Sequence, residues 1–451
     1  MVTGNGVQKN KGVLLMSVNN NLATTLLVKA KKLNLQDPLA GLIEQFLLPE
    51  NVIYLDGNSL GPLSKAAKAR ALEVVEQQWG NSLIASWNSH DWINLPKIVG
   101  NKIAKLVGAS PNTVICCDSI SVNLFKLLSA ALLLSVKQTY TARTLVLSQK
   151  DNFPTDLYMV QGLQQLMNSN SHAPCELMSV ASNELENAIE VHGHRIAVLM
   201  LTHVNFRNGD IHDMQRLTNL AHNKGILVLW DLAHSAGVLP LALEECDVDF
   251  AVGCTYKYLN GGPGAPGFAY VAKRLLPKLQ QPLSGWMGHK KPFEFAHDYE
   301  KAAGIEQLLC GTPSIISMSV LDASLDIFED LDLAVLRTKS IALNGFFQSC
   351  IEQMTVNSSC LKTPLILACN KEASMRGSQI SYQHPQAYAI CQALISDGVI
   401  SDFRAPDTLR IGFSPLFLNF TDMLKAAHIL TNILQTQRYE EPQYHVKNTV
   451  T

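Results

Sequence analysis

Between residues 113 and 275, short apolar runs alternate with longer helical segments, and this alternation limits the chain to few folds. Strands that are apolar along their whole length and separated by helices are typical of a mainly parallel sheet covered on both faces. The sequence therefore predicts an α/β fold with one large central sheet. The expected strands are Val114–Cys117, Thr144–Leu147, Ile196–Leu201, Ile226–Trp230, Phe250–Gly253 and Gly267–Val271, and the expected helices are Val122–Leu134, Asp156–Met167, Ser182–Val191 and Asp213–Asn223.

The remaining segments predict a smaller α/β domain that is assembled from both chain ends. A length of 451 residues suits two or three domains. After about residue 312 the pattern becomes helix-rich and then closes with a β–α module. We expect an N-terminal extension that is disordered over 1–20, a large domain over 51–310, a small domain over 21–50 and 311–436, and a disordered tail over 437–451.

Composition excludes several classes of protein. Lys plus Arg is 36 and Asp plus Glu is 38, so no basic face for nucleic acid is implied. No apolar run has the length of a membrane span or a secretory signal, which predicts a cytoplasmic protein without membrane contact. Ten cysteines are too sparse for a disulfide framework, and reduced thiols are expected. Charged residues are only 16 %, which favours an apolar interface between subunits.

Lys257 is the strongest candidate for a chemical role. It stands at the end of an apolar strand, between Tyr256 and Tyr258, and a glycine-rich loop follows. In so apolar a setting the neutral amine is favoured over the ammonium, and the neutral amine is the form that makes imines. The alternative is a surface lysine at a strand edge.

Asp231 ends the expected strand before that one, and His234 follows three positions later. A carboxylate at the end of a strand in an apolar sheet needs a cationic partner. A protonated pyridine nitrogen would supply that charge. The alternative is a helix N-cap with a neighbouring histidine.

The segment from Asp118 to Phe125 leads directly into an expected helix and contains Ser119 and Ser121. Hydroxyls and free backbone N–H groups at a helix start can cradle a phosphate. Either serine could instead be an ordinary N-cap. Together, the lysine, the aspartate and the helix start share one explanation, an enzyme that uses pyridoxal 5′-phosphate.

Several motifs, spread along the chain, resemble the kynureninase family. The similarity extends from about residue 30 to 435. It implies the fold-type I fold of pyridoxal-phosphate enzymes, related to class-V aminotransferases, with a seven-stranded sheet. The motifs are Tyr54–Gly61, Asn152–Asp156, Trp230–Gly237, Thr255–Gly264 and Gly285–His289.

The resemblance assigns roles to individual residues. Lys257 would bond to the cofactor aldehyde, Asp231 would pair with the ring nitrogen, and Phe153 would stack on the ring. Lys257, Tyr256 and Asp156 would be catalytic, with Tyr256 as a proton relay. The cofactor-binding residues would be Ile120, Ser121, Phe153, Thr202, Asp231, His234, Tyr256 and Lys257, joined by Trp286 and Thr312 from the other subunit of a homodimer.

The same resemblance implies hydrolysis of L-kynurenine to anthranilate and L-alanine, a step in tryptophan catabolism and in the kynurenine pathway towards NAD. Arg410 would bind the substrate carboxylate, and a guanidinium fork suits that task. Trp87 and Thr312 match the pattern that prefers kynurenine over 3-hydroxykynurenine, because an indole offers an apolar wall instead of a hydrogen-bond partner.

Other functions remain open from the sequence. One rival is another fold-type I enzyme, such as a cysteine desulfurase or selenocysteine lyase, which would need a reactive cysteine over the cofactor; Cys310 is the nearest candidate. Another rival is a non-catalytic protein that binds pyridoxal phosphate. No histidine spacing matches a set of metal ligands, so no metal is expected.

Overall fold

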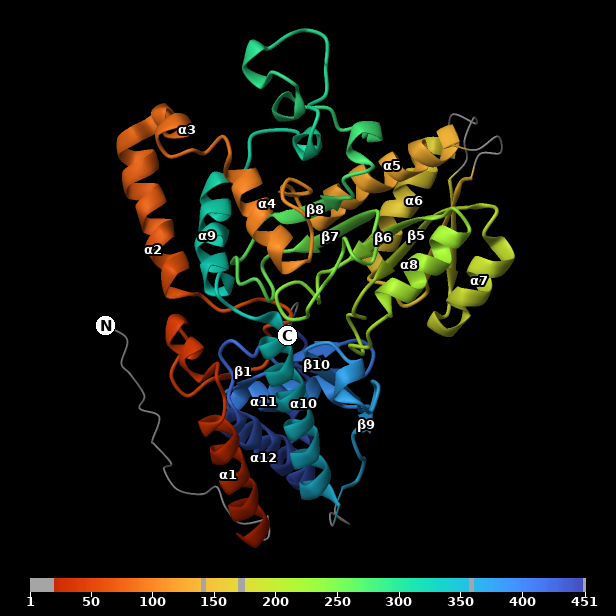
Figure 1. Cartoon of the computed structure of the whole chain (residues 1–451). Helices are drawn as coiled ribbons and strands as arrows, with labels where there is room; N and C mark the ends of the chain where they lie inside the picture. The colour runs from red at the N-terminus through yellow and green to blue at the C-terminus, as the bar shows by residue number, and fades with distance from the viewer. Residues whose placement is uncertain (1–19, 139–142, 169–174, 357–360, 449–451) are drawn as a thin grey trace.

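The computed structural model describes residues 20–138, 143–168, 175–356 and 361–448. Within these ranges the chain forms two lobes, an upper one around a large sheet and a lower one around a smaller sheet (Figure 1). The N-terminal extension predicted for 1–20 lies outside the described residues except for Asn20, which begins α1 (Asn20–Leu35).

The large sheet has seven strands in the described part of the chain, in the order β2-β8-β7-β6-β5-β3-β4. Neighbouring strands from β7 to β4 run parallel, whereas β8 runs antiparallel to both β2 and β7, so the predicted mainly parallel sheet is confirmed. The strands are β2 (Val114–Cys116), β3 (Leu145–Gln149), β4 (Glu176–Val180), β5 (Ile196–Thr202), β6 (Leu227–Asp231), β7 (Phe250–Cys254) and β8 (Gly267–Val271).

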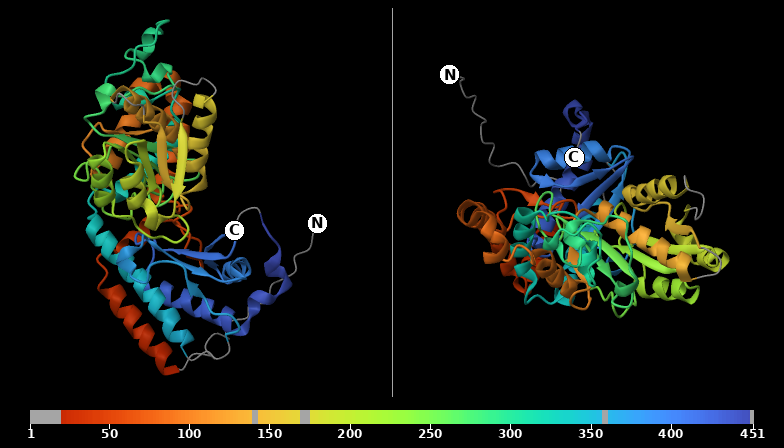
Figure 2. Two further views of the ribbon diagram at one scale, coloured as in Figure 1. Left: turned by 90° about the vertical axis from the view of Figure 1, so that its right-hand side faces the viewer. Right: turned by 90° about the horizontal axis from the view of Figure 1, so that it is seen from above.

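Helices cover both faces of this sheet, as the alternation predicts. The left view of Figure 2 shows the yellow strands of the sheet edge with helices on either side. Burial explains the pattern, because every residue of β2, β3, β5, β7 and β8 is buried. The helices are α5 (Ile120–Gln138), α6 (Pro154–Asn168), α7 (Leu185–His192) and α8 (Met214–Asn223).

The N-terminal part of the upper lobe forms a helical arm. Ser64 caps α2 (Lys65–Glu73) by accepting a hydrogen bond from the Ala67 N–H at 3.1 Å. A π-helical stretch, Val74–Ser82, continues the arm to α3 (Ser86–Ser89), and α4 (Leu95–Leu106) follows. Helix α9 (Ile315–Leu325) packs against α2 and α4 (Figure 1).

The lower lobe combines the two ends of the chain. Its four-stranded sheet has the order β12-β13-β10-β9, and in the described residues a separate strand pair joins β1 to β11 in parallel. Helix α1 packs against α12, and α12 packs against α10 and α11. The elements are β1 (Ile53–Tyr54), α10 (Leu333–Thr355), β9 (Ile366–Leu367), β10 (Gln379–Gln383), α11 (Ala387–Ser396), β11 (Val399–Ile400), β12 (Asp402–Arg404), β13 (Thr408–Gly412) and α12 (Phe420–Thr436).

The predicted domain boundaries, 51–310 and 21–50 with 311–436, remain a proposal. At one point we propose a change: because α9 lies with α2 and α4 in the upper lobe, the second boundary would fall between α9 and α10 instead of at residue 310. In the described parts of the chain, no helix is long and apolar enough to cross a membrane.

The prediction of a disordered tail over 437–451 is wrong for residues 437–448. Two short 3-10 turns, Arg438–Glu440 and Pro442–His445, pack against α11. Tyr439 and Tyr444 are buried there, and Arg438 forms an ion pair with Asp397. Apolar contact of two aromatic rings therefore orders a segment whose composition is polar.

Candidate active site

A cavity of about 280 Å³ opens at the carboxyl ends of β5, β6 and β7. The carboxyl ends of parallel strands meet at one edge of the sheet, where ligands of α/β proteins usually bind. Most of the predicted site residues meet in this cavity. Its lining includes Ile120, Ser121, Phe153, Asp156, Thr202, Asp231, His234, Tyr256 and Lys257.

Two buried carboxyl groups, of Asp156 and Asp231, lie in the cavity. Asp231 is the last residue of β6, and its Oδ1 accepts a hydrogen bond from the Ala233 N–H at 2.7 Å. The carboxyl oxygens of Asp156 accept no hydrogen bond from an amide, hydroxyl or cationic group among the described residues, and its side chain shares a hydrogen bond with that of Asp231. Burial raises the pKa of Asp156 far above its usual value, and the negative charge of Asp231 adds to this. The pair therefore suits a ligand that brings a positively charged N–H group.

Lys257 lies beside these carboxyl groups. Burial raises the pKa of Asp231, and the positive charge of Lys257 opposes that rise. The surroundings of Lys257 therefore include charged groups as well as the apolar part of the cavity lining, and the apolar setting expected from the strand stays a prediction. Lys257 Nζ lies 3.0 Å from His234 Nε2. Burial, together with the charges of Lys257 and Arg410, lowers the pKa of His234 well below its usual value, so the imidazole is neutral.

The start of α5 forms the other end of the cavity. Ser119 Oγ accepts a hydrogen bond from the Val122 N–H at 3.4 Å, so the N-cap interpretation holds for Ser119. Ser121 lies in the first turn, where backbone N–H groups lack partners inside the helix. A Cβ atom at Gly267 would lie 3.1 Å from the nitrogen of Ile120, so the close approach of β8 to this turn favours glycine, and a larger residue would push the turn away by a few tenths of an ångström. Such a helix start suits a phosphate.

Aromatic side chains form the walls of the cavity. The Phe153 ring meets the Phe206 ring edge to face, with centroids 5.2 Å apart. The Tyr256 ring centroid lies 5.9 Å from Lys257 Nζ. Burial raises the pKa of Tyr256 above its usual value, so its phenol stays protonated and can donate a hydrogen bond. Thr202 also lines the cavity, and its hydroxyl donates to the Asn152 side chain.

These groups fit pyridoxal 5′-phosphate. The start of α5 offers backbone N–H groups that could hold the phosphate. The Lys257 amine lines the cavity and could bond to the aldehyde, and the carboxyl groups of Asp231 and Asp156 could pair with the ring nitrogen. Apart from the hydrogen bond shared with Asp231, the oxygens of Asp156 lack a partner among the described residues, as does Nδ1 of His234, and these are the atoms that a polar ligand would satisfy. Across the described ranges, no group of three or more His, Cys, Asp or Glu residues could hold a metal ion.

Three predicted site residues lie away from this cavity within one chain. Trp87, in α3, packs edge to face on Trp92 with ring centroids 6.2 Å apart. Trp286 packs on Phe293 and Phe295 in the segment that projects at the top of Figure 1. Thr312 lines a separate cavity of about 210 Å³. Their predicted contact with the cofactor or the substrate stays a prediction.

Arg410 is also absent from the cavity lining, but it lies directly behind the wall. It is fully buried on β13, and its Nη1 donates a hydrogen bond to the carbonyl of Phe206. Phe206 itself lines the cavity. Arg410 is therefore separated from the cavity by Phe206, to which it is hydrogen-bonded.

Several lining residues escaped prediction from the sequence: Ser119 was expected only as part of the helix start, and Phe206 was not expected at all. Phe206 lies in a loop without a recognisable motif, so no local signal marks it. Cys254 could have been found, because it ends the strand that leads to Lys257. The other unpredicted lining residues are Thr155, Ala233, Ala265 and Gly267.

Comparisons with known proteins identify relatives over nearly the whole chain. The family model for the kynureninase C-terminal domain matches residues 336–430, and the class-V aminotransferase model matches residues 101–365. A kynureninase of Pseudomonas fluorescens is 46% identical over 420 residues, covering 93% of this chain and 98% of that protein. A kynureninase of Burkholderia mallei is 44% identical over 428 residues, covering 94% of this chain and 99% of that protein.

Solved structures share the fold at low identity. An apo cysteine desulfurase from Thermococcus onnurineus is 16% identical with a TM-score of 0.71, and covers 88% of this chain and 98% of its own. A C-DES variant with glycine linked to its PLP cofactor is 15% identical with a TM-score of 0.72, and covers 86% of this chain and 98% of its own. The predicted fold-type I architecture is thereby confirmed. With the curated relatives, these findings establish that the chain belongs to the kynureninase family.

Proposed function

We propose that this chain uses pyridoxal 5′-phosphate to hydrolyse L-kynurenine to anthranilate and L-alanine. Membership of the kynureninase family supports this reaction. The observation that carries the proposal is the convergence of Lys257, Asp231 and the start of α5 on one cavity. The place of the reaction in tryptophan catabolism follows from its substrate, and the cytoplasmic location stays a prediction.

The residues of the cavity divide between holding the cofactor and handling protons. Ile120 and Ser121, at the start of α5, would hold the phosphate together with Thr202 and Tyr256. Phe153 would cover the ring, and Lys257 would bond to the aldehyde. When bound, the cofactor supplies an electron sink for the carbon atoms next to the substrate amine.

Asp231 and Asp156 would keep a proton on the ring nitrogen, because two carboxyl groups buried together favour a bound cation. With the substrate bound, the Lys257 amine would accept the proton from the substrate Cα and return it. The neutral imidazole of His234, 3.0 Å from Lys257 Nζ, can accept a hydrogen bond from that amine and so orient it. Burial raises the pKa of Tyr256, so its phenol would stay protonated and donate a hydrogen bond, and in the proposed relay it would pass on its proton only as it receives another.

Substrate selection would involve Arg410, Trp87 and Thr312. Arg410 would bind the α-carboxylate, and Trp87 would present an apolar wall to the aryl ring. Trp87 and Thr312 together would favour kynurenine over 3-hydroxykynurenine, because they stand where members that prefer the 3-hydroxy compound carry His and Asn to hydrogen-bond the added hydroxyl. A rate with 3-hydroxykynurenine equal to that with kynurenine would contradict this preference.

The test is anthranilate fluorescence after mixing the cofactor-loaded protein with L-kynurenine. We expect release of anthranilate from the wild type and loss of release in Lys257→Ala. Lys150→Ala is the matched control, because Lys150 also follows a strand of the sheet but lines a different cavity. Release of sulfide from L-cysteine, without anthranilate from kynurenine, would instead support the desulfurase alternative. Cys254 is the cysteine of the cavity lining, and burial raises the pKa of its thiol, which disfavours a nucleophilic role.

We also propose a homodimer in which Trp286 and Thr312 complete the partner's cavity. The low charged fraction of 16 % and the exposed Phe293 and Phe295 beside Trp286 support an interface in this region. Mixing Lys257→Ala subunits with Trp286→Ala subunits tests it. A hybrid dimer then contains one intact site, and random mixing restores about a quarter of the wild-type activity. No restoration would mean that Trp286 acts within its own subunit, and full activity of Trp286→Ala subunits alone would mean that Trp286 does not act at the site.

A further inference from the structure

Two strands of the lower lobe place Asp402 next to Arg410. Strands β12 and β13 run antiparallel, and Asp402 stands directly opposite Arg410 in their register. Directly opposed residues point to the same face of a sheet, so their side chains meet. Both side chains are almost fully buried, with 3% and 1% of their surfaces exposed.

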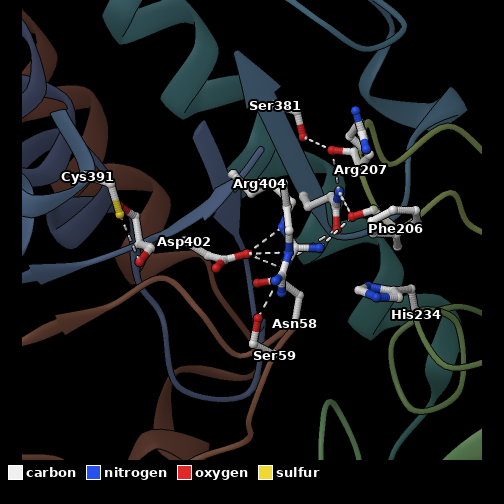
Figure 3. A network of polar contacts seen from close by, with 12 residues as sticks. Asn58, Ser59, Phe206, Arg207, His234, Ser381, Cys391, Asp402 and Arg404 are labelled. Carbon is white, nitrogen blue, oxygen red and sulfur yellow. Dashed lines mark hydrogen bonds and ion pairs between the residues drawn. The ribbon is translucent and has the colours of Figure 1, made fainter. Parts of the chain in front are cut away.

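Each nitrogen of the Arg410 guanidinium has a partner. Nε donates to Asp402 Oδ2 at 2.7 Å, and Nη2 is paired with the same oxygen. Nη2 also donates to Ser59 Oγ at 3.1 Å, and Nη1 donates to the carbonyl of Phe206. Figure 3 shows this network, with Asp402 and Ser59 on one side and Phe206 on the other. Asp402 is thus the charged anchor, whereas the other two partners are neutral.

Asp402 also forms an ion pair with a second arginine, Arg404. Arg404 lies two residues further along β12, on the same face, and its Nε is 3.1 Å from Asp402 Oδ2. The Arg404 side chain is 41% exposed, so solvent already stabilises its charge. The buried Arg410 depends on Asp402 far more, because an isolated guanidinium is costly to bury.

We propose that Asp402 is a positioning residue that fixes the Arg410 guanidinium for the carboxylate of the substrate. This inference rests on the proposed function, since it requires Arg410 to receive that carboxylate. Hydrogen bonds between charged groups are stronger than those to neutral oxygens. An incoming carboxylate therefore displaces the Phe206 carbonyl and Ser59 and leaves the bond to Asp402 in place.

Loss of this anchor affects binding of the carboxylate more than the chemical step. Without the charge of Asp402, no carboxylate among the described residues pairs directly with the guanidinium, and the charge of Asp56 acts on it only through space. The KM for L-kynurenine rises at least tenfold in Asp402→Asn, while kcat changes less than threefold, because Lys257 and Asp231 are untouched.

A pair of ligands separates positioning from a general structural effect. The first is a kynurenine analogue without its α-amino group, which cannot bond to the cofactor, and the second is the same molecule with its carboxylate converted to a primary amide. Calorimetry on the cofactor-loaded protein gives the preference for carboxylate over amide. We expect that preference to fall roughly tenfold in Asp402→Asn.

Two control variants test whether the fall in carboxylate preference is specific to Asp402. Asp37→Asn breaks the other buried pair of the lower lobe, Lys339 with Asp37 at 2.7 Å, and should lower stability while leaving the carboxylate preference unchanged. Arg404→Gln alters an exposed side chain and should keep the preference within about threefold of the wild type.

An unchanged preference in Asp402→Asn overturns the inference, as does an equal loss for both ligands. A loss in Arg404→Gln as large as that in Asp402→Asn also overturns it, because Arg404 would then be the carboxylate-binding group. If the wild type releases no anthranilate from kynurenine, the proposed function fails, and that failure is seen before any variant is compared.

Discussion

The carboxyl group of Asp56 predicts a stability that falls as the pH rises towards neutral. Asp56 follows β1, and its buried Oδ1 has no hydrogen-bond partner among the described residues. Burial raises its pKa from 3.8 to about 6, and the negative charge of Asp402 adds to this. A hydrogen bond from Ser59 and the charges of Arg410 and Arg404 oppose the rise. The folded state therefore binds the proton of Asp56 more tightly than the unfolded state does.

The sign and size of the effect follow from this difference. Well below pH 3.8 both states are protonated, and from about pH 3.8 to 6 the unfolded state has lost its proton while the folded state keeps it. Stability is lost over that window and stays lower above it. The shift from 3.8 to about 6 corresponds to about 3 kcal/mol at neutral pH. The amide side chain in Asp56→Asn cannot ionise, so this variant does not bear the free-energy cost of ionising a buried carboxyl group.

Thermal unfolding of the cofactor-loaded protein between pH 4.5 and 8 measures the difference. We expect Asp56→Asn to melt about 6 °C above the wild type at pH 8, at roughly 2 °C per kcal/mol, and only about 2 °C above it at pH 4.5, where the unfolded carboxyl is mostly ionised but the folded one is not. Asp330→Asn, at an exposed position, is the control and should show the same pH dependence as the wild type. A difference between Asp56→Asn and the wild type that does not change with pH, or a less stable variant at pH 8, would refute the electrostatic reasoning.

Three further predictions address the cofactor and the surface. Asp231→Asn should weaken cofactor binding at least tenfold, measured by the absorbance retained after dialysis, because a neutral amide cannot stabilise a protonated ring nitrogen. Gly267→Ala should weaken binding through the phosphate, since its Cβ would lie 3.1 Å from the Ile120 nitrogen; titration with the cofactor checks this. His222 pairs with Asp249 at 2.8 Å, and this hydrogen bond raises the pKa of His222. His222→Gln should therefore cost up to ~1 kcal/mol below pH 6.5, and the cost should fade as the pH rises through the raised pKa.

Burial decides which strands could be predicted from the sequence. The central strands are buried on both faces and are therefore continuous apolar runs, as in Ile196–Thr202. Strand β4 (Glu176–Val180) was missed because each of its residues is only partly buried, so it has no continuous apolar run. Strand β2, at the other edge of the sheet, is fully buried and was predicted, so burial rather than edge position decides the strength of the signal. The ordered tail escaped for a related reason, because Tyr439 is buried by contacts that are distant in the sequence.

The candidate site could be predicted where function depends on a strand end or a helix start. Lys257 and Asp231 stand at the carboxyl ends of apolar strands, and Ser121 lies in the first turn of a helix. Because these strand ends and this helix start lie at the same edge of the sheet, the three residues meet there. The pairing of Asp402 with Arg410 could not be found this way, because it depends on the register of β12 and β13. Phe206 depends on contacts between the lobes, which leave no periodic pattern.

The meeting of the lobes at Phe206 has a consequence for binding. Its ring packs on Phe153 in the cavity wall, while its carbonyl accepts a hydrogen bond from Arg410 of the lower lobe. Gln379 of β10 contacts the same carbonyl at 3.4 Å. The upper lobe supplies the amine and the carboxyl groups of the site, and the lower lobe supplies the guanidinium. A substrate that replaces the Phe206 carbonyl on Arg410 therefore releases one of the contacts that hold the cavity wall to the lower lobe, so binding of the carboxylate and the position of the aromatic wall are coupled.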